Sequence, residues 1–288
     1  MIKELLSSGK LVKTRNGFHS TCYFVEGNDD IVVLETAKFN PGNGTVTYDD
    51  IKKVKDKTDE LLSQDLPVAE ILDFSFDDPK FFHRVYKKIS GSPILRPWTN
   101  KVYDLGENQH EELDALLSAP KGDIKQILKD AEGITSNFVA IDFDPGNILR
   151  DKDTGKTHFI DWFIRPPSSY ADDEDVYGSE YGKDGIFGPA AAVASGVCTL
   201  FHDTYKGHEK TMNEDLRAKY IEVYERFAEF FGPLGEYMIH QSQTSNEGNP
   251  FDKNKLSHLL QLHPSFYGDK VPKGFDPKIF DVRNVSIN

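Results

Sequence analysis

The 288-residue sequence contains only two cysteines, Cys22 and Cys198, which lie far apart and lack metal-ligand spacing. We therefore expect no disulfide framework and no cysteine-ligated metal, and a reducing compartment is the simpler setting. No apolar run approaches the roughly 18 residues that a membrane-spanning helix needs. The first residues, MIKELLSSGKLVK, also lack the long apolar stretch of a signal peptide. These absences predict a soluble, cytoplasmic protein without a membrane partner.

Basic residues are few: 34 Lys and Arg stand against 47 Asp and Glu, so the formal net charge is −13. An acidic chain repels phosphate backbones, and nucleic acid is therefore not an expected partner. The densest basic stretch, between Lys52 and Lys57, alternates with acidic residues as a solvated helix face does. An acidic surface can also concentrate cationic ligands, although simple solubility explains the same composition.

Aromatic residues are abundant, with twenty Phe and twelve Tyr, and 38% of the chain is hydrophobic. This composition supports a packed core, and the length allows one large domain or two lobes. The first ninety residues are predicted to form two strands, a helix and two more strands: Thr21–Glu26, Ile31–Thr36, Tyr48–Gln64, Ile71–Phe76 and Phe81–Ile89. We expect a hairpin turn at Asn28–Asp30 and a polar loop at Arg15–Ser20.

Helices are predicted to dominate after Gly91, with ranges Glu111–Ser118, Asp123–Asp130, Phe187–Tyr205, Asn213–Phe231 and Lys253–Leu262. The expected fold is therefore α+β, with a small β-rich N-lobe over residues 1–90 and a larger helical C-lobe over 91–288. We place the hinge between the two predicted lobes at Tyr86–Gly91. Ligand-binding sites often occur where two domains meet.

One stretch concentrates polar residues at the ends of apolar runs. Asp142 ends the run Phe138–Ile141, and Asn147 follows it across a tight Pro-Gly turn. After a charged hairpin, Asp161 ends a second apolar run. Phosphoryl transfer needs metal ions that neutralise the phosphates and a group that orients the attacking hydroxyl. Carboxylate and amide oxygens suit Mg²⁺, and a further carboxylate suits the base.

The run Asp142–Ile148, DFDPGNI, followed by Ile160–Trp162, IDW, resembles the motifs of the aminoglycoside phosphotransferase family. That family shares the protein-kinase-like fold with choline, homoserine and methylthioribose kinases. Its pattern is His-Gly-Asp-Leu-His-Pro-Gly-Asn-Ile and then Ile-Asp-Trp. The resemblance implies that Asp142 is the catalytic base and that Asn147 and Asp161 are magnesium ligands. Here Ala140 and Asp144 replace the two His residues of the pattern.

The resemblance also implies a nucleotide site in the N-lobe. Tyr86 and Lys88 lie in the segment similar to the adenine-contacting hinge, while Ser20 and Thr21, after Gly17 and His19, could offer phosphate contacts. The family would place its ATP lysine near Glu35, but the nearest lysine is Lys38. A reversed Glu35–Lys55 pair is one alternative, and a pair of Lys38 with Asp49 or Asp56 is another.

These residues predict a magnesium-dependent phosphotransferase that moves the γ-phosphate of ATP or GTP to a hydroxyl of a small molecule. The acceptor could be aminoglycoside-like, an amino alcohol or a sugar, and the acidic C-lobe favours a cationic one. The irregular lysine strand also fits a nucleotide-binding pseudokinase or interaction module with little turnover. A protein kinase is a third alternative. The acidic segment Asp172–Asp175 is either an exposed loop or a cation-binding wall.

Overall fold

The computed structural model describes residues 2–7, 10–16, 20–40, 44–95, 108–164, 189–208, 212–245, 248–251 and 285–288. The chain divides into two compact units. The first unit comprises Met1–Ser92 and Leu149–Ile160, and the second comprises Pro93–Ile148 and Asp161–Asn288. None of the helices within the described ranges is both long and apolar enough to cross a membrane. The predicted helix at Lys253–Leu262 lies outside the described residues.

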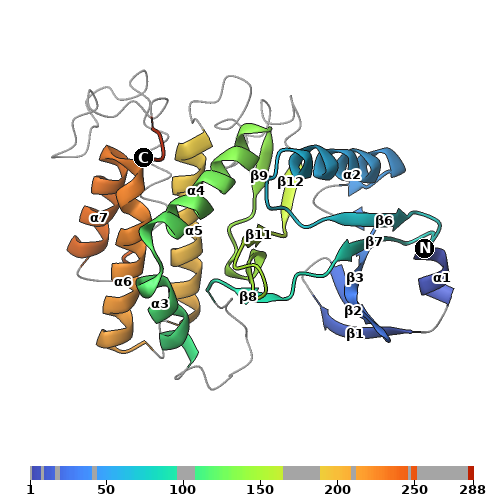
Figure 1. Cartoon of the computed structure of the whole chain (residues 1–288), viewed down its shortest axis with the longest axis horizontal. Coiled ribbons are helices and arrows are strands. Elements are labelled where there is room, and N and C mark those ends of the chain that lie inside the picture. Colours follow the sequence, from blue (N-terminus) through green and yellow to red (C-terminus); the bar gives the residue numbers. More distant parts are fainter. Residues whose placement is uncertain are drawn as a thin grey trace. The chain divides into compact units, whose positions relative to one another are not determined.

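The first unit is built on a five-stranded antiparallel sheet with the order β1-β2-β3-β7-β6 (Figure 1). The strands are β1 (Leu11–Asn16), β2 (Ser20–Val25), β3 (Asn28–Ala37), β6 (Ile71–Ser75) and β7 (Phe81–Lys87). All four predicted strands are present. The sequence did not indicate β1, and part of it was expected to be loop. An edge strand of mixed polarity forms here because its backbone pairs with β2.

The β2–β3 hairpin turns at Glu26–Gly27, two residues earlier than the predicted Asn28–Asp30 turn. Gly27 has a φ of +79°, and Asn28 already pairs with Val25 across the two-residue loop. A two-residue hairpin favours such positive φ values, which glycine adopts without a steric penalty. The short strands β4 (Phe39–Asn40) and β5 (Gly44–Thr45) follow.

The two faces of the sheet have different neighbours. On one face, α1 (Ile2–Ser7) packs against Val33 and Val85. On the other face, which we call the pocket face, Val32 and Leu34 pack near Val54 of α2 (Tyr48–Ser63). The predicted helix Tyr48–Gln64 is thus confirmed. Because side chains alternate between faces along a strand, even-numbered residues of β2, β3 and β7 belong to the pocket face.

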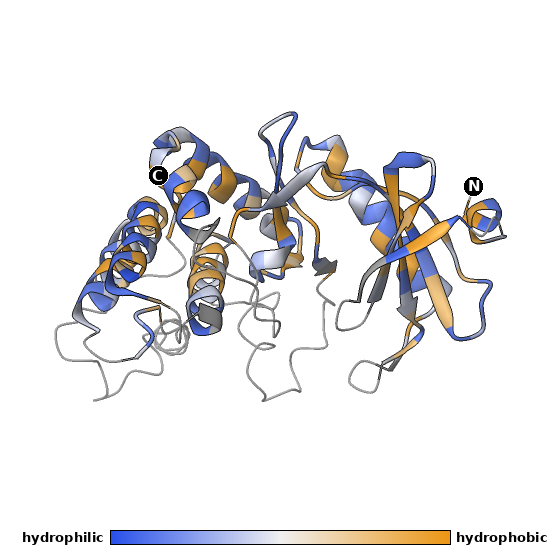
Figure 2. Cartoon of the chain, turned by 90° about the horizontal axis from the view of Figure 1, so that it is seen from below, coloured by the Kyte–Doolittle hydropathy of each residue, from blue (hydrophilic) through white to orange (hydrophobic). Residues whose placement is uncertain are grey.

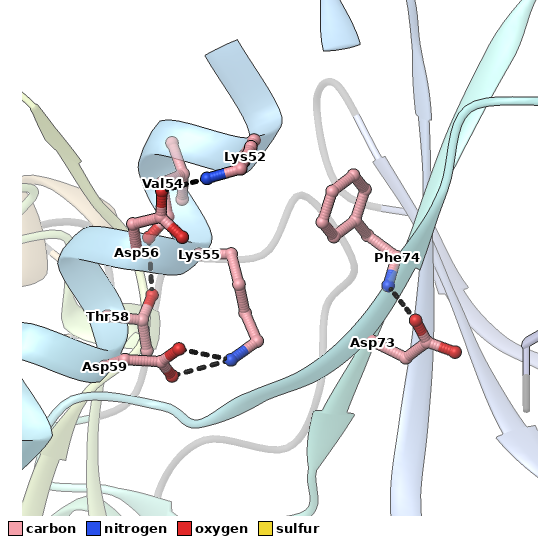
Figure 3. Close-up of polar contacts among 8 residues, drawn as sticks. All are labelled: Lys52, Val54, Lys55, Asp56, Thr58, Asp59, Asp73 and Phe74. Carbon is pink, nitrogen blue, oxygen red and sulfur yellow. Dashed lines mark hydrogen bonds and ion pairs between the residues drawn. The ribbon is translucent and has the colours of Figure 1, made fainter. Parts of the chain in front are cut away.

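Ion pairs within one turn stabilise the charged side of α2. Lys52 pairs with Asp56 and Lys55 with Asp59, each at 2.6 Å and four residues apart (Figure 3). Solvent screens such exposed pairs, so each stabilises the helix only slightly. Thr47 caps the helix start by accepting from the Asp50 backbone N–H. The predicted charged helix face is therefore built from internal pairs.

The hairpin at residues 149–160 belongs to the first unit, although the sequence placed everything after residue 90 in the second lobe. Its strands are β10 (Ile148–Asp151) and β11 (Thr157–Phe159), and β8 (Gly91–Pro93) pairs with β10. Backbone hydrogen bonds explain the assignment: the Phe159 N–H donates to Pro67 O at 2.9 Å, and the Lys152 N–H donates to Ser90 O at 2.9 Å. These long-range bonds cannot be seen in the local sequence.

The second unit is mainly helical. Its helices are α3 (Asn108–Ser118), α4 (Lys121–Ser136), α5 (Pro189–His208), α6 (Glu214–Ala228) and α7 (Pro233–Thr244). Buried rings form its core, with Phe201, Tyr224 and Phe251 within 4.9–5.6 Å of one another. Figure 2 shows hydrophobic and hydrophilic sides alternating around these helices. The predicted helices in the described ranges are present, but α4 is longer than expected.

Helix α7 was not predicted from the sequence; it begins with Pro233 and contains Gly235. Proline is tolerated at the first helical position because its missing N–H would have no intrahelical partner. A Cβ on Gly235 would clash with the carbonyl oxygen of Ala228. Pro233 therefore begins the helix, and Gly235 allows α7 to approach the backbone of Ala228 at the end of α6. Only the packing shows these two roles.

His158 on β11 is expected to make the stability of the first unit sensitive to acid. Its Nδ1 is buried and has no hydrogen-bond partner among the described residues. Burial lowers the pKa of His158, the charge of Asp151 opposes this shift, and Lys156 and Lys87 add to it. An unfolded histidine binds its proton near pH 6.5. Below that pH the unfolded chain gains a proton that the folded chain resists, so stability falls as pH falls.

We expect His158→Gln to reduce this acid-dependent loss. Urea-unfolding midpoints at pH 7.5 and pH 5.5 should differ less in the variant than in the wild type. The exposed His240 on α7 provides the control, because His240→Gln makes the same chemical change at an exposed histidine. Identical pH dependence of the wild type and His158→Gln would show that His158 does not cause the effect.

Candidate functional site

Two short strands bring Asp142 and Asp161 together in the second unit. β9 (Val139–Ile141) pairs antiparallel with β12 (Trp162–Ile164), and Ile141 lies opposite Trp162. Asp142 follows the first strand and Asp161 precedes the second. The backbone N–H of Asp142 consequently donates to the carbonyl oxygen of Asp161 at 3.1 Å. The register of this strand pair therefore sets the separation of the two acidic residues.

A tight turn adds Asn147 to the pair. A single 3-10 turn spans Pro145–Asn147, and Asp144 caps it by accepting from the Gly146 N–H at 2.8 Å. Asn147 then donates from Nδ2 to Oδ2 of Asp142 at 3.0 Å. The backbone N–H of Asp144 donates to the other carboxylate oxygen of Asp142 at 3.1 Å. The structure thus brings the three predicted C-lobe residues into one cluster and orients the carboxylate of Asp142.

The surroundings of Asp142 favour proton uptake. Burial of its carboxyl raises the pKa of Asp142, and the nearby charges of Asp144 and Asp203 raise it further. The hydrogen bonds from Asp144 N–H and Asn147 oppose these effects. The residue nevertheless keeps an exposed surface, so a ligand can reach it. A partly exposed carboxylate with a raised pKa is suited to accept a proton.

Asp203 is a site neighbour that the sequence did not indicate. It lies on α5, far from Asp142 in the chain and in no motif. Packing explains its position: Gly196 on α5 contacts the buried ring of Phe143, and a Cβ there would clash with that ring. Asp203 is seven residues further along, which is two helical turns and the same helix face. No local pattern could have predicted this approach.

Asn147 and Asp161 carry the donor types that suit Mg²⁺. Their side chains offer an amide and a carboxylate oxygen, and Mg²⁺ commonly takes one or two carboxylates plus phosphate and water. Since Nδ2 of Asn147 faces Asp142, its Oδ1 is directed away from that carboxylate. Within the described residues, no group of three or more His, Cys, Asp or Glu could hold a metal by itself. The donor set therefore fits a metal that shares its shell with phosphate oxygens.

The first unit contains a pocket of about 640 Å³. The pocket face of the sheet forms one wall, and Leu149 and Ile160 lie among the other apolar lining residues. The rim is the segment at residues 87–92. The predicted hinge residues Tyr86 and Lys88 both line it, with Lys88 Nζ 4.7 Å from the ring centroid of Phe24. A flat ring with polar edges fits such a mostly apolar pocket with a backbone rim.

The other predicted nucleotide residues do not line this pocket. Ser20 lies on the pocket face and is hydrogen-bonded to Thr36, with the hydroxyl oxygens 2.8 Å apart. Thr21 lies on the opposite face, in register with Glu35. Lys38 donates from Nζ to the carbonyl oxygen of Phe76 at 2.7 Å, and the same Nζ lies 3.6 Å from the centroid of the Phe76 ring. Gly17, His19 and Asp172–Asp175 lie outside the described residues.

Neither alternative pairing for the missing lysine is present in the described contacts. Glu35 faces away from the pocket, accepts from the Tyr23 hydroxyl at 3.1 Å and contacts His83 at 3.1 Å. Lys55 donates to both carboxylate oxygens of Asp59 at 2.6 Å (Figure 3). The described contacts therefore do not support the alternative of a Glu35–Lys55 pair. The two-residue alternation of the strand puts the odd-numbered Glu35 on the wrong face.

Comparison with known proteins adds little to this geometry. No family model and no curated protein matches the chain. Among solved structures, the chain is similar to the PK-1 kinase of Cydia pomonella granulovirus. The two share 11% sequence identity over 92% of this chain and 97% of the viral kinase, with a TM-score of 0.42. A similarity this distant supplies no functional argument, so function depends on the site residues.

Proposed function

We propose that this chain is a kinase-type phosphotransferase that uses Mg²⁺ and moves the γ-phosphate of ATP or GTP to a hydroxyl of a small molecule. The observation that carries the proposal is the cluster of Asp142, Asn147 and Asp161, joined by hydrogen bonds of 3.0 and 3.1 Å. The cluster combines a base candidate with two oxygen donors for metal. Its motif resembles that of the aminoglycoside phosphotransferase family, which supports the same roles.

Asp142 accepts the proton of the attacking hydroxyl in this proposal. The hydroxyl oxygen forms a bond to the γ-phosphorus, the bond from that phosphorus to the bridging oxygen breaks, and the nucleoside diphosphate leaves. Asn147 and the backbone N–H of Asp144 hold the carboxylate in place through their hydrogen bonds. Positioning is the main protein contribution to such reactions, because the transfer needs little covalent chemistry.

Asn147 and Asp161 would hold the metal through their side-chain oxygens. Bound Mg²⁺ supplies neutralisation of the phosphate charge. The pocket of the first unit, lined by Tyr86 and Lys88, would hold the nucleotide base. In the sequence, Ile160 of that pocket is followed directly by Asp161 of the cluster. The proposal thus assigns binding of the base to the pocket of the first unit and binding of the metal to the cluster of the second.

The acidic neighbours of Asp142 favour a cationic or amine-bearing acceptor. Asp144 and Asp203 both lie close enough for their charges to raise the pKa of Asp142. A ligand amine would be attracted by this concentration of negative charge, whereas a neutral sugar would not be. We therefore favour an aminoglycoside-like compound or an amino alcohol over a sugar.

Replacing Asp161 tests the metal assignment. We expect Asp161→Ala to weaken binding of Mg²⁺–nucleotide by about tenfold or more, a scale known for lost metal-site partners. Calorimetry with and without Mg²⁺ measures this, and the loss should vanish when Mg²⁺ is absent. Asp153→Ala, on the exposed tip of the 149–160 hairpin, is the matched control. Unchanged affinity in Asp161→Ala would count against a metal role.

A nucleotide-binding protein without turnover is the second candidate. The placement of Lys38 favours it, because its Nζ is held by Phe76 instead of lining the pocket. Thermal-shift measurements with Mg²⁺–ATP and Mg²⁺–GTP, combined with phosphate-transfer assays over a panel of amines, amino alcohols and sugars, separate the candidates. Binding with no transfer to any acceptor supports the second, and transfer to one of them supports the first.

A further inference from the structure

Arg84 is a cation on the pocket face of the sheet. It lies in the middle of β7, directly opposite Leu34 of β3 and Phe74 of β6. Residues directly opposite in an antiparallel pair project from the same face. Leu34 lines the pocket, so Arg84 projects from the sheet face that forms the pocket wall. The sequence did not indicate a role for Arg84, because Arg84 belongs to no motif.

The guanidinium of Arg84 lies between two aromatic rings. Its central carbon is 5.4 Å from the ring centroid of Phe82 and 5.5 Å from that of Tyr86. Both distances are within the range of a cation–π interaction. Nε is buried, however, and has no hydrogen-bond partner among the described residues. A buried donor without an acceptor is unfavourable, and an anionic ligand beside this half-buried guanidinium would offset that cost.

The register of three strands divides the pocket face into rows of changing chemistry. One row contains Phe24, Val32 and Tyr86, which all line the pocket. The next row contains Cys22, Leu34 and Arg84, and the third contains Ser20, Thr36 and Phe82. Successive rows are about 7 Å apart along the strands. Moving away from the pocket, the face thus changes from apolar to cationic and then to hydroxyl-bearing.

Among the described residues, several other cations near this face are engaged, and Lys152 lines the pocket from the 149–160 hairpin and not from the sheet. Lys38 is held by Phe76, and Lys55 is paired with Asp59. Lys88 follows Tyr86 in the chain and contacts the ring of Phe24, at the end of the pocket away from the hydroxyl row. Arg84 belongs to the row between the apolar row and the hydroxyl row, beside Leu34, which lines the pocket, although Arg84 itself is not a lining residue. A guanidinium also suits phosphate because its planar N–H groups match two phosphate oxygens.

We propose that Arg84 binds the phosphate chain of the nucleotide and takes the role of the lysine that β3 lacks. This inference rests on the proposed nucleotide-binding function and names a residue for it. The base occupies the apolar row, and the phosphates extend over Arg84 toward the hydroxyls of Ser20 and Thr36. Arg84 supplies this cation from β7, the strand next to β3, where Leu34 is its cross-strand partner.

Calorimetry on the full chain tests the proposal with matched probes: adenosine and Mg²⁺–ATP, and guanosine and Mg²⁺–GTP. The adenine or guanine pair is chosen according to which one the wild type binds more tightly. For that pair, we expect Arg84→Met to weaken triphosphate binding at least tenfold while nucleoside affinity changes less than twofold. Met retains the length of the side chain and can pack between the same two rings. Arg84→Lys, which keeps the charge, should recover part of the triphosphate affinity.

Lys38→Met is the control, because it removes a cation of the same face that contacts Phe76, and it should leave both affinities unchanged. Equal loss of nucleoside and triphosphate binding in Arg84→Met would reduce Arg84 to a packing role and overturn the proposal. Unchanged triphosphate affinity would overturn it too, while leaving the proposed function intact. If the wild type binds neither nucleoside nor triphosphate, the proposed function fails and this inference with it.

Circular dichroism reports whether each variant is folded. Should Arg84→Met fail to fold, Arg84→Lys decides the question. A phosphate-binding role requires Arg84→Lys to bind the triphosphate more tightly than the nucleoside. Loss of that preference in a folded Arg84→Lys, with nucleoside binding retained, would show that a positive charge at this position is not sufficient and would overturn the proposal as stated.

Discussion

Asp142→Asn is expected to lower phosphate-transfer turnover by about 10² to 10⁴-fold, the usual contribution of a positioned general base. The substitution removes the group that takes the hydroxyl proton but retains the size of the side chain. Nucleotide affinity should change little, because the proposal assigns Asp142 to the acceptor hydroxyl and assigns the base pocket and the metal to other residues. The expected signature is therefore a loss in kcat with the Kd of the nucleotide preserved.

Steady-state transfer assays and calorimetry on the same preparations measure the two quantities. Asp153→Asn is the matched control, because it makes the same chemical change at an exposed hairpin position. We expect this control to retain wild-type turnover. Wild-type turnover in Asp142→Asn would refute its role as base, and a parallel loss of nucleotide binding would indicate a general disturbance of the fold.

Gly91→Ala is expected to cause the largest loss of stability. A Cβ at this position would clash with the carbonyl oxygen of Arg150 on β10 and come close to the Cα of Asp151. These are backbone atoms, which cannot rotate away as the end of a side chain can. Overpacking typically costs about 1–3 kcal/mol, and a backbone clash belongs at the upper end of that range. Since Gly91 also lines the pocket rim, nucleotide binding should weaken as well.

Urea denaturation measures the loss as a lower unfolding midpoint. Gly122→Ala on α4 is the control with the opposite sign, because a Cβ there meets nothing within 4 Å. Replacing glycine with alanine inside a helix adds up to about 1 kcal/mol of stability, and less in the first turn, where Gly122 lies. An unchanged midpoint in Gly91→Ala would mean that β8 and β10 do not pack as closely as the structure shows.

Local patterns predicted the elements that have strong periodicity and missed those that depend on neighbours. The amphipathic period of Tyr48–Ser63 and the apolar runs of β3 and β7 were sufficient to predict them. β1 was missed because an edge strand acquires its structure from the hydrogen bonds of β2. α7 was missed because its Pro and Gly resemble breakers until their packing is known.

The sequence by itself determined the C-lobe cluster, since Asp142, Asn147 and Asp161 are close in the chain and are joined by one turn and one strand pair. Short-range geometry of this kind is encoded locally. Only the tertiary structure brought Asp203 near Asp142 and put Arg84 on the pocket face. Helix packing and strand register decide such positions, and both depend on contacts between residues far apart in the sequence. Glu35 shows the same limit, because a one-residue change in register moves a side chain to the other face of a sheet.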